Sequence, residues 1–466
     1  MHYVLQILFR YQFQVKSKNC TAVNRFMDKN KKVLGFTLGC RLNQADTALI
    51  FGRLENDGYT IVKPGSGVEP DLVIVNTCTV TSNAARKSRQ SARSFRKKFP
   101  NACIIVAGCD CEKGIAEWEK ESAVDLIIPN AEKKDIAHRV KIWRDNRGFS
   151  REGVDLPPLS CSEECTVSGV EFSTAGIDTS FREDAIADYP FKSRAFLKVQ
   201  EGCNAFCTYC IVPYVRGRER SRSFREVLDE AKAFIDKGHR EIVITGVNIS
   251  TYRDGNICIA DLIERLIGLP GDFRLRLSSM EPHPENRPLI DLIASSSKLC
   301  RFLHLPLQHG TDAILERMGR NYTTAEFADF MNKASEKIPG VHLGTDIIVG
   351  FPGESDDLFR DSSAFISSLP IANAHIFRFS PREGTPAADY SGQIPQITAK
   401  HRAVELGLIT AEMNKNFAES QKGSNVRVLI EKENSDKSFE GWSDNYIKVN
   451  ISGEGIVPGE FKNIIL

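Results

Sequence analysis

The sequence lacks any uninterrupted apolar run of about 18 residues, the length that a helix needs to cross a bilayer, so we expect no membrane segment. It also lacks an excess of either charge, because 61 lysines and arginines against 60 acids leave a net charge of +1. Any surface that binds nucleic acid must therefore be a local patch. No secretory signal accompanies the 13 cysteines, which favours metal ligands in a reducing compartment, the cytoplasm, over disulfides.

The first residues contain no acid before Asp28 but several basic side chains: Arg10, Lys16, Lys18 and Arg25. This composition is typical of a transit peptide, although the apolar stretch is short. Met27 stands just before the first strand-like run, which favours a start site upstream of the true one. We expect residues 1–31 to be an extension outside the fold, either disordered or preceding the true start.

Short β-rich runs alternate with helical periodicity over residues 32–145, which predicts a small α/β domain with a parallel sheet. Its strands are expected at 33–38, 72–76, 104–107 and 124–128. Residues 146–190 mix proline, serine, glycine and acids without steady periodicity, and this pattern indicates a linker.

Over residues 191–421 the alternation resumes on a larger scale. Six strand-like runs, each followed by a helical segment, predict a partial, open (β/α)6 barrel rather than the closed eight-unit form. These strands are expected at 195–199, 242–247, 273–279, 302–307, 341–349 and 372–379. Residues 422–466 alternate in 426–430 and 446–451 between glycine turns, which predicts a small all-β module.

One cysteine motif directly follows the first barrel strand: Gln200-Glu-Gly-Cys203-Asn-Ala-Phe-Cys207-Thr-Tyr-Cys210. Its three thiolates are one short of filling a four-iron cluster, which leaves one iron open for chemistry. A zinc site is the alternative, but zinc normally takes a fourth Cys or His, and only the distant His309 is attractive. A ferredoxin-like electron carrier is a further alternative. The motif resembles the radical S-adenosylmethionine superfamily, in which the cofactor binds the open iron and is cleaved to a 5′-deoxyadenosyl radical.

Three more cysteines each fall just past the end of an expected parallel strand: Leu38-Gly-Cys40, Asn76-Thr-Cys78 and Ala107-Gly-Cys109. Such ends share one edge of a sheet, so the three thiolates can meet and hold a second cluster. Gly39 and Gly108 permit sharp turns and close approach of the backbone. The alternative is three buried core cysteines, which we expect for Cys103. Cys111 competes with Cys109 as a ligand, and the Gly-Cys context favours Cys109.

Both cysteine groups, in this order, resemble the methylthiotransferase family of radical enzymes over residues 32–466. The resemblance implies two [4Fe–4S] clusters and S-adenosylmethionine, with a second molecule of it as methyl donor. It implies that Cys40, Cys78 and Cys109 hold the cluster that donates sulfur. Cys203, Cys207 and Cys210 would hold the cluster that generates the radical.

Several residues at barrel strand ends are candidate contacts for S-adenosylmethionine. Gly246 offers close backbone approach beside Asn248, and Glu281 or Asp346 can receive ribose hydroxyls or an ammonium group. For Asp346 a salt-bridged strand-end acid has nearly equal weight. Tyr209 resembles the family's aromatic residue beside the adenine, or it simply packs against the cluster.

A basic run after the cysteine motif is a candidate phosphate-binding surface, made of Arg216, Arg218, Arg220 and Arg222. The acid-free helical segment 86–98 is a second candidate, although basic runs are usually solvated surface. The C-terminal module resembles the TRAM domain, an RNA-binding domain of tRNA-modifying relatives. Its alternatives are a lid that stabilises the barrel and a module that grips a protein.

Four segments resemble the branch that acts on N6-threonylcarbamoyladenosine beside the anticodon, at position 37 of tRNA: 39–44, 214–222, 277–282 and 379–386. This implies the tRNA anticodon stem-loop as partner and an external electron donor such as flavodoxin or ferredoxin. Residues 201–204 and 308–310 depart toward the branch that modifies ribosomal protein S12. That branch, the isopentenyladenosine branch and a non-catalytic iron–sulfur carrier stay open as alternatives.

Overall fold

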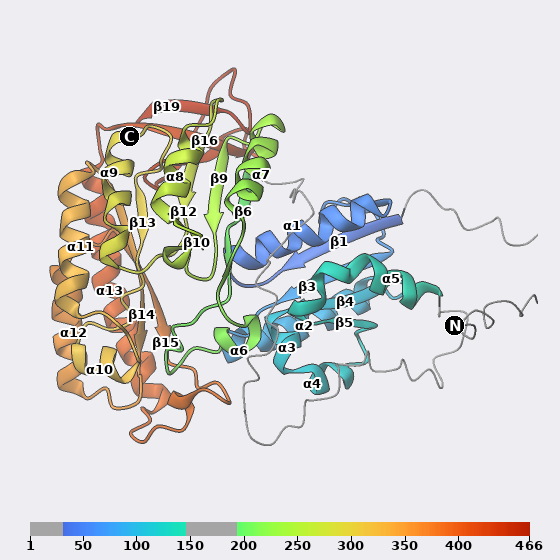
Figure 1. The fold of residues 1–466 in the computed structure, drawn as a ribbon, viewed down its shortest axis with the longest axis horizontal. Helices are drawn as coiled ribbons and strands as arrows, with labels where there is room; N and C mark the ends of the chain where they lie inside the picture. The colour runs from blue at the N-terminus through green and yellow to red at the C-terminus, as the bar shows by residue number, and fades with distance from the viewer. Residues whose placement is uncertain (1–30, 146–192) are drawn as a thin grey trace, which may run out of the picture.

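The computed structural model describes residues 31–145 and 193–466 (Figure 1). The expected extension up to residue 30 and the whole expected linker 146–190, with Cys161 and Cys165, lie outside the described residues. Within the described part, an N-terminal parallel sheet, an open barrel and a C-terminal antiparallel sheet follow one another along the chain. The fold class expected from the sequence is therefore confirmed.

The N-terminal domain is built on a five-stranded parallel sheet in the order β2-β1-β3-β4-β5. The central strands β3 and β4 are buried along their whole length, which explains why they appear in the sequence as continuous apolar runs. The five strands are β1 (Lys31–Thr37), β2 (Tyr59–Ile61), β3 (Leu72–Thr77), β4 (Cys103–Gly108) and β5 (Leu126–Ile128). The edge strand β2 was not expected, because three residues are too short to show alternation.

Helices cover both faces of this sheet. One layer of the core gathers around Phe51 and Ile74, and the other gathers around Trp118 and Val75. The helices are α1 (Arg41–Asn56), α2 (Ser82–Lys98), α3 (Cys109–Lys113), α4 (Ile115–Glu119) and α5 (Ile136–Asp145), with a 3-10 turn η1 (Asn130–Asp135) before α5.

The barrel consists of two three-stranded parallel sheets, β12-β9-β6 and β13-β14-β15. A bridge between Leu275 and Leu299 joins them just before β13 begins. Its six strands are β6 (Arg194–Lys198), β9 (Glu241–Thr245), β12 (Arg274–Leu277), β13 (Phe302–His304), β14 (His342–Val349) and β15 (Asn373–Arg378). All six lie within the ranges expected from the sequence, apart from one residue at the start of β6 and one at the start of β9.

Helices on the outer side of the barrel bury a single large apolar cluster against the strands (Figure 1). The longest of them, α13, runs the length of the barrel. The helices after each strand are α6 (Val212–Arg216), α7 (Phe224–Asp236), α8 (Ile259–Ile267), α9 (Pro288–Ser295), α10 (Asp312–Arg317), α11 (Thr324–Lys337), α12 (Asp356–Ser368) and α13 (Gln396–Ser420).

The C-terminal module is an antiparallel sheet in the order β18-β17-β16-β19, made of β16 (Asn425–Glu433), β17 (Phe439–Ser443), β18 (Lys448–Ile451) and β19 (Phe461–Ile465). It lies at the end of the barrel opposite α6 (Figure 1). Arg274 and Arg276, at the beginning of β12, donate to carbonyl groups of Trp442 and Ser443 at 2.9 and 3.0 Å. Both arginines pair with the fully buried Glu241, so this seam is held by charge as well as by apolar packing.

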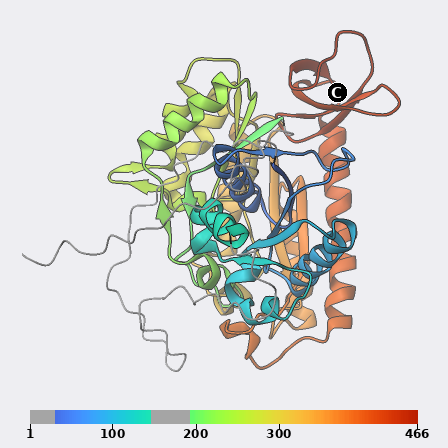
Figure 2. The ribbon, with the colours of Figure 1, turned by 90° about the vertical axis from the view of Figure 1, so that its right-hand side faces the viewer.

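The N-terminal domain lies across the open side of the barrel, with the carboxyl ends of its strands turned inward (Figures 1 and 2). Helix α1 serves both domains. Its Ile50 and Phe51 pack in the N-terminal core, whereas Ala45 packs against Phe196 and Val243 of the barrel. Among the described residues, no helix is both long and apolar enough to cross a membrane.

Candidate functional site

The first group of cysteines lies at the carboxyl edge of the N-terminal sheet. Cys40 is the N-cap of α1, Cys78 follows β3 and Cys109 begins α3 after β4. Strands β1, β3 and β4 are adjacent and parallel, so the three positions meet at one edge although 69 residues separate the first from the last.

Two glycines make this meeting possible. Gly39 and Gly108 have φ values of 97° and 106°, a conformation that residues with a side chain rarely adopt. A Cβ atom at Gly39 would lie 2.9 Å from the sulfur of Cys78, and one at Gly108 would lie 2.5 Å from the carbonyl oxygen of Thr77. The sharp turns expected from the sequence are therefore present, and they bring the cysteine-bearing loops into direct contact.

The thiols at this edge influence one another. Burial raises the pKa of Cys78 to about 12, and the neighbouring Cys109 and Cys40 add to the shift. Burial raises the pKa of Cys40 as well. Clustered thiols of this kind lose their protons readily only to a metal, because metal binding replaces the proton on sulfur. This donor set fits an iron–sulfur cluster with one iron left open.

Cys111 and Cys103 point elsewhere. Cys111 packs in the core with Trp118 and lies 3.6 Å from Oγ1 of Thr77. Cys103 is fully buried in β4, as expected for a core cysteine. Cys109 instead packs against Ile211 and Val215 of the barrel. The choice of Cys109 over Cys111 as a ligand stays a prediction, and these positions support it.

The second group of cysteines lies on one loop of the barrel, between two very short strands, β7 (Gln200–Glu201) and β8 (Arg220–Ser221), that pair with each other. The loop is fixed by backbone hydrogen bonds on both sides. The amide of Cys203 donates to Gly217 at 3.2 Å, and that of Thr208 donates to Met318 at 2.9 Å. Burial raises the pKa of Cys210 to about 12, and Cys207 adds to the shift. Three thiols of one loop thus converge, a donor set that fits a [4Fe–4S] cluster.

Arg320 connects this loop to a predicted cofactor residue. Its Nη1 donates to the sulfur of Cys207 at 3.2 Å, and its Nη2 lies 2.8 Å from Oε1 of Glu281. Burial would lower the pKa of Arg320, but Tyr209, Tyr322, Cys207 and Glu281 together hold it well above its usual range. A permanent positive charge therefore stands beside the cysteine loop.

Arg216, at the end of α6, reaches from the barrel into the N-terminal domain. Its Nε donates to the sulfur of Cys109 at 3.1 Å, and its Nη2 donates to the side-chain oxygen of Asn43. The same nitrogen lies 3.1 Å from Asp46, and Nη1 pairs with Glu201. A single buried side chain therefore contacts the first cysteine group, helix α1 and the strand that precedes the second cysteine group.

The two acids beside Arg216 are also held by lysines. Lys133 and Lys198 lie 2.7 and 2.9 Å from the carboxylate oxygens of Asp46, and Lys198 also pairs with Glu201. Burial alone would raise the pKa of Asp46, but the three cations hold it well below its usual range. The same charges lower the pKa of Glu201. The domains therefore meet through a largely buried network of three cations and two acids.

The expected cofactor residues near β9 are shaped by Gln200. Its side-chain oxygen accepts from the amides of Val247 and Asn248 at 2.9 and 3.0 Å, and its amide nitrogen donates to Gly202 at 2.7 Å. A Cβ atom at Gly246 would lie 2.9 Å from that same oxygen. The Asn248 side chain caps the 3-10 turn η3 (Ile249–Thr251). The backbone at Gly246 therefore lies close to the side chain of Gln200.

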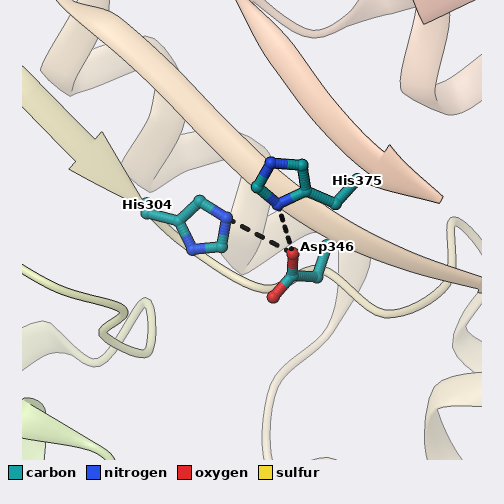
Figure 3. Close-up of side chains that lie close together, drawn as sticks. All are labelled: His304, Asp346 and His375. Atoms are coloured by element: carbon teal, nitrogen blue, oxygen red, sulfur yellow. Dashed lines mark hydrogen bonds and ion pairs between the residues drawn. The ribbon is translucent and has the colours of Figure 1, made fainter. Parts of the chain in front are cut away.

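The other expected cofactor residues are divided between two places. Tyr209 lies edge-on to Phe351, with ring centroids 6.5 Å apart, in an apolar cluster beside the loop. Asp346 lies on the inner wall of the barrel between two histidines, 3.4 Å from Nε2 of His304 and 3.1 Å from Nδ1 of His375 (Figure 3). Although burial opposes it, hydrogen bonds from these histidines lower the pKa of Asp346 to about 2. Asp346 therefore pairs with histidines of the two neighbouring strands, and its contact with S-adenosylmethionine stays a prediction.

The four arginines of the expected phosphate surface differ in exposure. Arg216 and Arg222 are buried, the latter paired with Glu230. Neither offers its guanidinium group to solvent. Arg218 is exposed and lies over the ring of Phe206 at 4.3 Å, and Arg220 is half-buried. The run is basic because two of its members are internal counter-ions, a role that composition alone does not reveal.

The expectation for helix α2 as a basic surface is also corrected. It contains no acid, but α4 and the segment after it supply acids from outside the helix: Arg89 lies 2.9 Å from Glu117, and Arg93 lies 2.7 Å from Glu121. Arg96 pairs with Asp125. Four basic side chains of the helix are exposed and have no acid partner among the described residues: Arg86, Lys87, Lys97 and Lys98. The helix is therefore basic over a smaller surface than its sequence suggests.

The two cysteine groups lie on either side of the start of α6. Cys210 is followed directly by Ile211, and Cys109 of the other group packs on Ile211 and Val215. A further contact between the two domains involves the segment after β15. There Arg382 donates to Thr79, and Oγ of Ser380 lies 3.1 Å from Oγ of Ser82. The zinc alternative loses its candidate ligand, because His309 is fully buried with Nε2 3.3 Å from Glu354.

Sequence reasoning missed the roles of Gln200, Arg320, Asp46, His304 and His375. The sequence held a partial signal for two of them: Gln200 stands inside the cysteine motif, and Asp46 lies two residues after the segment 39–44. For the histidines there was no local signal, because each stands alone on a different strand.

Comparison with known proteins agrees with this geometry. Residues 197–366 match the Radical SAM superfamily, and residues 32–129 match the family described as Uncharacterized protein family UPF0004. The Radical SAM match implies S-adenosylmethionine and a [4Fe–4S] cluster, for which the cysteine loop is the fitting donor set. The solved structure of the radical S-adenosylmethionine methyltransferase TsrM from Kitasatospora setae has a similar fold, with a TM-score of 0.54 and 15% identity over 77% of this chain and 75% of that one.

Curated relatives cover almost the whole chain. The threonylcarbamoyladenosine tRNA methylthiotransferase MtaB of Aquifex aeolicus is 33% identical over 91% of this chain and 97% of its own length. The tRNA-2-methylthio-N(6)-dimethylallyladenosine synthase of Alkaliphilus oremlandii is 32% identical over 94% of this chain and 90% of its own. The chain therefore belongs to the radical S-adenosylmethionine methylthiotransferase family and is an enzyme that transfers a sulfur-containing group.

Proposed function

We propose that this enzyme converts N6-threonylcarbamoyladenosine at position 37 of tRNA into its 2-methylthio derivative, with one [4Fe–4S] cluster on each cysteine group. The observation that carries the proposal is that two separate three-cysteine groups meet at the start of α6, where Cys109 packs on Ile211, the residue that follows Cys210. Relatives named as threonylcarbamoyladenosine tRNA methylthiotransferases in Aquifex aeolicus and Bacillus subtilis, 33% and 31% identical, support the substrate.

In this proposal the cysteine loop of the barrel, Cys203, Cys207 and Cys210, holds the cluster that binds S-adenosylmethionine. A cluster and S-adenosylmethionine bound at this loop would together supply a 5′-deoxyadenosyl radical, which can take the otherwise inert hydrogen from C2 of adenine. The positive charge of Arg320 next to Cys207 stabilises the thiolate form of the loop. Gln200 holds the turn at Gly246 and Asn248 against the loop, where the cofactor binds in this proposal.

The second group, Cys40, Cys78 and Cys109, holds the cluster that provides sulfur. Arg216 donates to Cys109 while its charge is balanced by Asp46 and Glu201, so it fixes the first group relative to the second. Holding two reactive centres about one substrate apart lowers the entropy cost of their reaction. Helix α1 packs against the inner wall of the barrel and excludes water from the same region.

For the tRNA we propose a contact surface made of basic residues at the surface of the fold, namely the exposed Arg218, Arg86, Lys87, Lys97 and Lys98 and the half-buried Arg220. Contacts of this kind bind phosphate without reading sequence. The C-terminal module is a further candidate, as the TRAM-like element of the proposal. A cytoplasmic location and a flavodoxin or ferredoxin as electron donor complete it.

The test is mass spectrometry of nucleosides from tRNA of cells with and without the gene. Loss of 2-methylthio-N6-threonylcarbamoyladenosine, with accumulation of its unthiolated precursor, is the expected result. Loss of the 2-methylthio derivative of isopentenyladenosine instead would assign the enzyme to the activity named for the Alkaliphilus relative. An unchanged nucleoside profile would overturn the tRNA assignment, and the peptides of ribosomal protein S12 would be measured next.

A further inference from the structure

Three polar side chains lie together on the inner wall of the barrel, and none of them belongs to either cysteine group (Figure 3). They are His304 at the end of β13, Asp346 in β14 and His375 in β15. Asp346 is the register partner of His375, and His304 is the partner of Gly344, two residues before Asp346. Since side chains two residues apart share a face of a strand, all three side chains point to the same side.

The three side chains are spaced as metal ligands are. Nε2 of His304 and Nδ1 of His375 approach the same carboxylate oxygen of Asp346, at 3.4 and 3.1 Å. All three ligand atoms lie within 4.8 Å of one another. A cation bound to nitrogen and oxygen at about 2.0–2.2 Å holds tetrahedral ligand atoms about 3.3–3.5 Å apart. Two of the three ligand-atom separations are therefore already close to those around a bound cation, and the third, between the two imidazole nitrogens, is within 4.8 Å.

The geometry at His304 is not explained by an ion pair alone. His304 is only 9% exposed, and the one acceptor near its Nε2 among the described residues, the Asp346 carboxylate oxygen at 3.4 Å, is too poorly placed for a well-formed hydrogen bond. A buried polar atom left without a partner is destabilising, so such atoms are rare. The other nitrogen of the ring, Nδ1, lies 3.0 Å from Oγ of Ser279. This is how metal-binding histidines are usually held, with one nitrogen oriented by a neighbour and the other free for the metal.

We propose that His304, Asp346 and His375 form a binding site for one divalent transition-metal ion, of which Zn²⁺ is the representative. Two imidazoles and one carboxylate suit metals of this class, whereas the cysteine groups offer only sulfur. The His375 side chain is 57% exposed, so the remaining coordination positions face open space. Arg41, which follows Cys40, acts electrostatically on His375, so the site faces the N-terminal domain. The proposal stands independently of the tRNA assignment.

The decisive measurement is zinc X-ray absorption on the full chain with its iron–sulfur clusters loaded, after one equivalent of Zn²⁺ is added. The expected result is a shell of nitrogen and oxygen at about 2.0–2.1 Å with no sulfur. A sulfur shell at about 2.3 Å would place the zinc on cysteine and overturn the proposal.

Variants provide a second, independent readout, namely zinc bound after equilibrium dialysis, counted by elemental analysis together with iron. We expect Asp346→Asn and His375→Gln to bind Zn²⁺ at least tenfold more weakly than the unchanged protein, with the iron content unaltered. His375→Gln removes an exposed ring, so it keeps the test valid if Asp346→Asn folds poorly. The matched control is His401→Gln, an exposed histidine on α13 that should leave zinc binding unchanged. Equal zinc binding by all four proteins would overturn the proposal.

Discussion

The two cysteine groups bring three thiols together by different routes. Cys203, Cys207 and Cys210 belong to one loop of eight residues, pinned at its base by the pairing of β7 with β8. Cys40, Cys78 and Cys109 stand on three loops, and they meet only because three parallel strands end at the same edge. The first group is local in the sequence, whereas the second is a product of the sheet.

The contacts that hold the two cysteine groups in place also differ in whether they are local. The barrel loop is held mostly by its own domain, through Met318, Arg320 and the hairpin. The N-terminal group depends on a side chain of the other domain, because Arg216 contacts the sulfur of Cys109. We therefore expect changes at the domain contact to affect the N-terminal group far more than the barrel loop, and four predictions test this difference.

The largest effect is expected from the cysteines themselves. Replacing Cys203, Cys207 or Cys210 by alanine should abolish 5′-deoxyadenosine formation under reducing conditions. Replacing Cys40, Cys78 or Cys109 should leave that activity in place and stop insertion of sulfur. Chromatography of deoxyadenosine and of modified nucleosides from one reaction measures both. If the two sets of variants lost both products alike, the proposed division of labour would be wrong.

The second prediction concerns the domain contact. Arg216→Met removes one of the cations shared by two buried acids, and it should lower the free energy of unfolding by about 3 kcal/mol. The iron bound by the N-terminal group should fall, while deoxyadenosine formation by the barrel loop persists. Thermal unfolding and iron analysis of the variant measure this.

The matched control for that prediction is Arg222→Met, which removes another buried arginine, paired with Glu230 inside the barrel. It should cost similar stability without selective loss of the N-terminal iron. Equal iron loss in both variants would show that general stability, rather than the contact with Cys109, is what matters.

A third change should affect the barrel loop alone. In Gly246→Ala the new Cβ atom meets the Gln200 oxygen at 2.9 Å, and that oxygen also accepts from Val247 and Asn248. Crowding of this kind costs about 1–3 kcal/mol. We expect weaker binding of S-adenosylmethionine in equilibrium dialysis, with the N-terminal iron unchanged. Gly407→Ala, where no atom lies within 4 Å of the new Cβ, is the control and should bind the cofactor normally.

The smallest effect concerns a residue far from both groups. Burial, helped by the charge of Arg276, lowers the pKa of His342 to about 4 from the usual value of about 6.5. Because the unfolded chain takes up a proton there while the folded chain does not, stability is full above pH 6.5 and falls as the pH drops toward 4. The loss should be about 1 kcal/mol between pH 7 and pH 5.5.

His342 packs against Phe302 and Tyr446, so His342→Phe should preserve the packing and flatten this dependence. Urea unfolding at a series of pH values measures it. An unchanged slope in the variant would assign the pH dependence to other groups. Both cysteine groups should respond alike to this change, in contrast to the response to Arg216→Met.

Much of the fold was predictable because its strands are strongly patterned. Five of the six barrel strands and the central strands of the N-terminal sheet were expected within two residues of their observed ends, whereas β13 ends three residues earlier than expected. Strands β2, β17 and β19 were missed, since they are only three to five residues long and lie at or near sheet edges. The placement of three cysteines at strand ends was sufficient to predict that they meet, because parallel strands end at one edge.

The roles of charged residues were much less predictable. Arg216 and Arg222 appeared as members of a basic run, yet each is buried with an acid that lies far from the run or on another element. The same holds for α2, whose acid partners come from α4 and beyond. A sequence shows only which charges are neighbours along the chain, whereas the acid that neutralises a buried arginine in the fold often comes from a distant segment.

By itself the sequence determined the order of the domains, the members expected for the two cysteine groups and the family, because these depend on strand patterns, on one compact cysteine motif and on cysteines that directly follow predicted strands. Only the tertiary structure decided that Arg216 joins the two groups, that Gln200 supports the turn at Gly246 and that Asp346 lies between two histidines. Each of these contacts joins residues from different strands, helices or domains. Packing brings such residues together, and no local pattern records it.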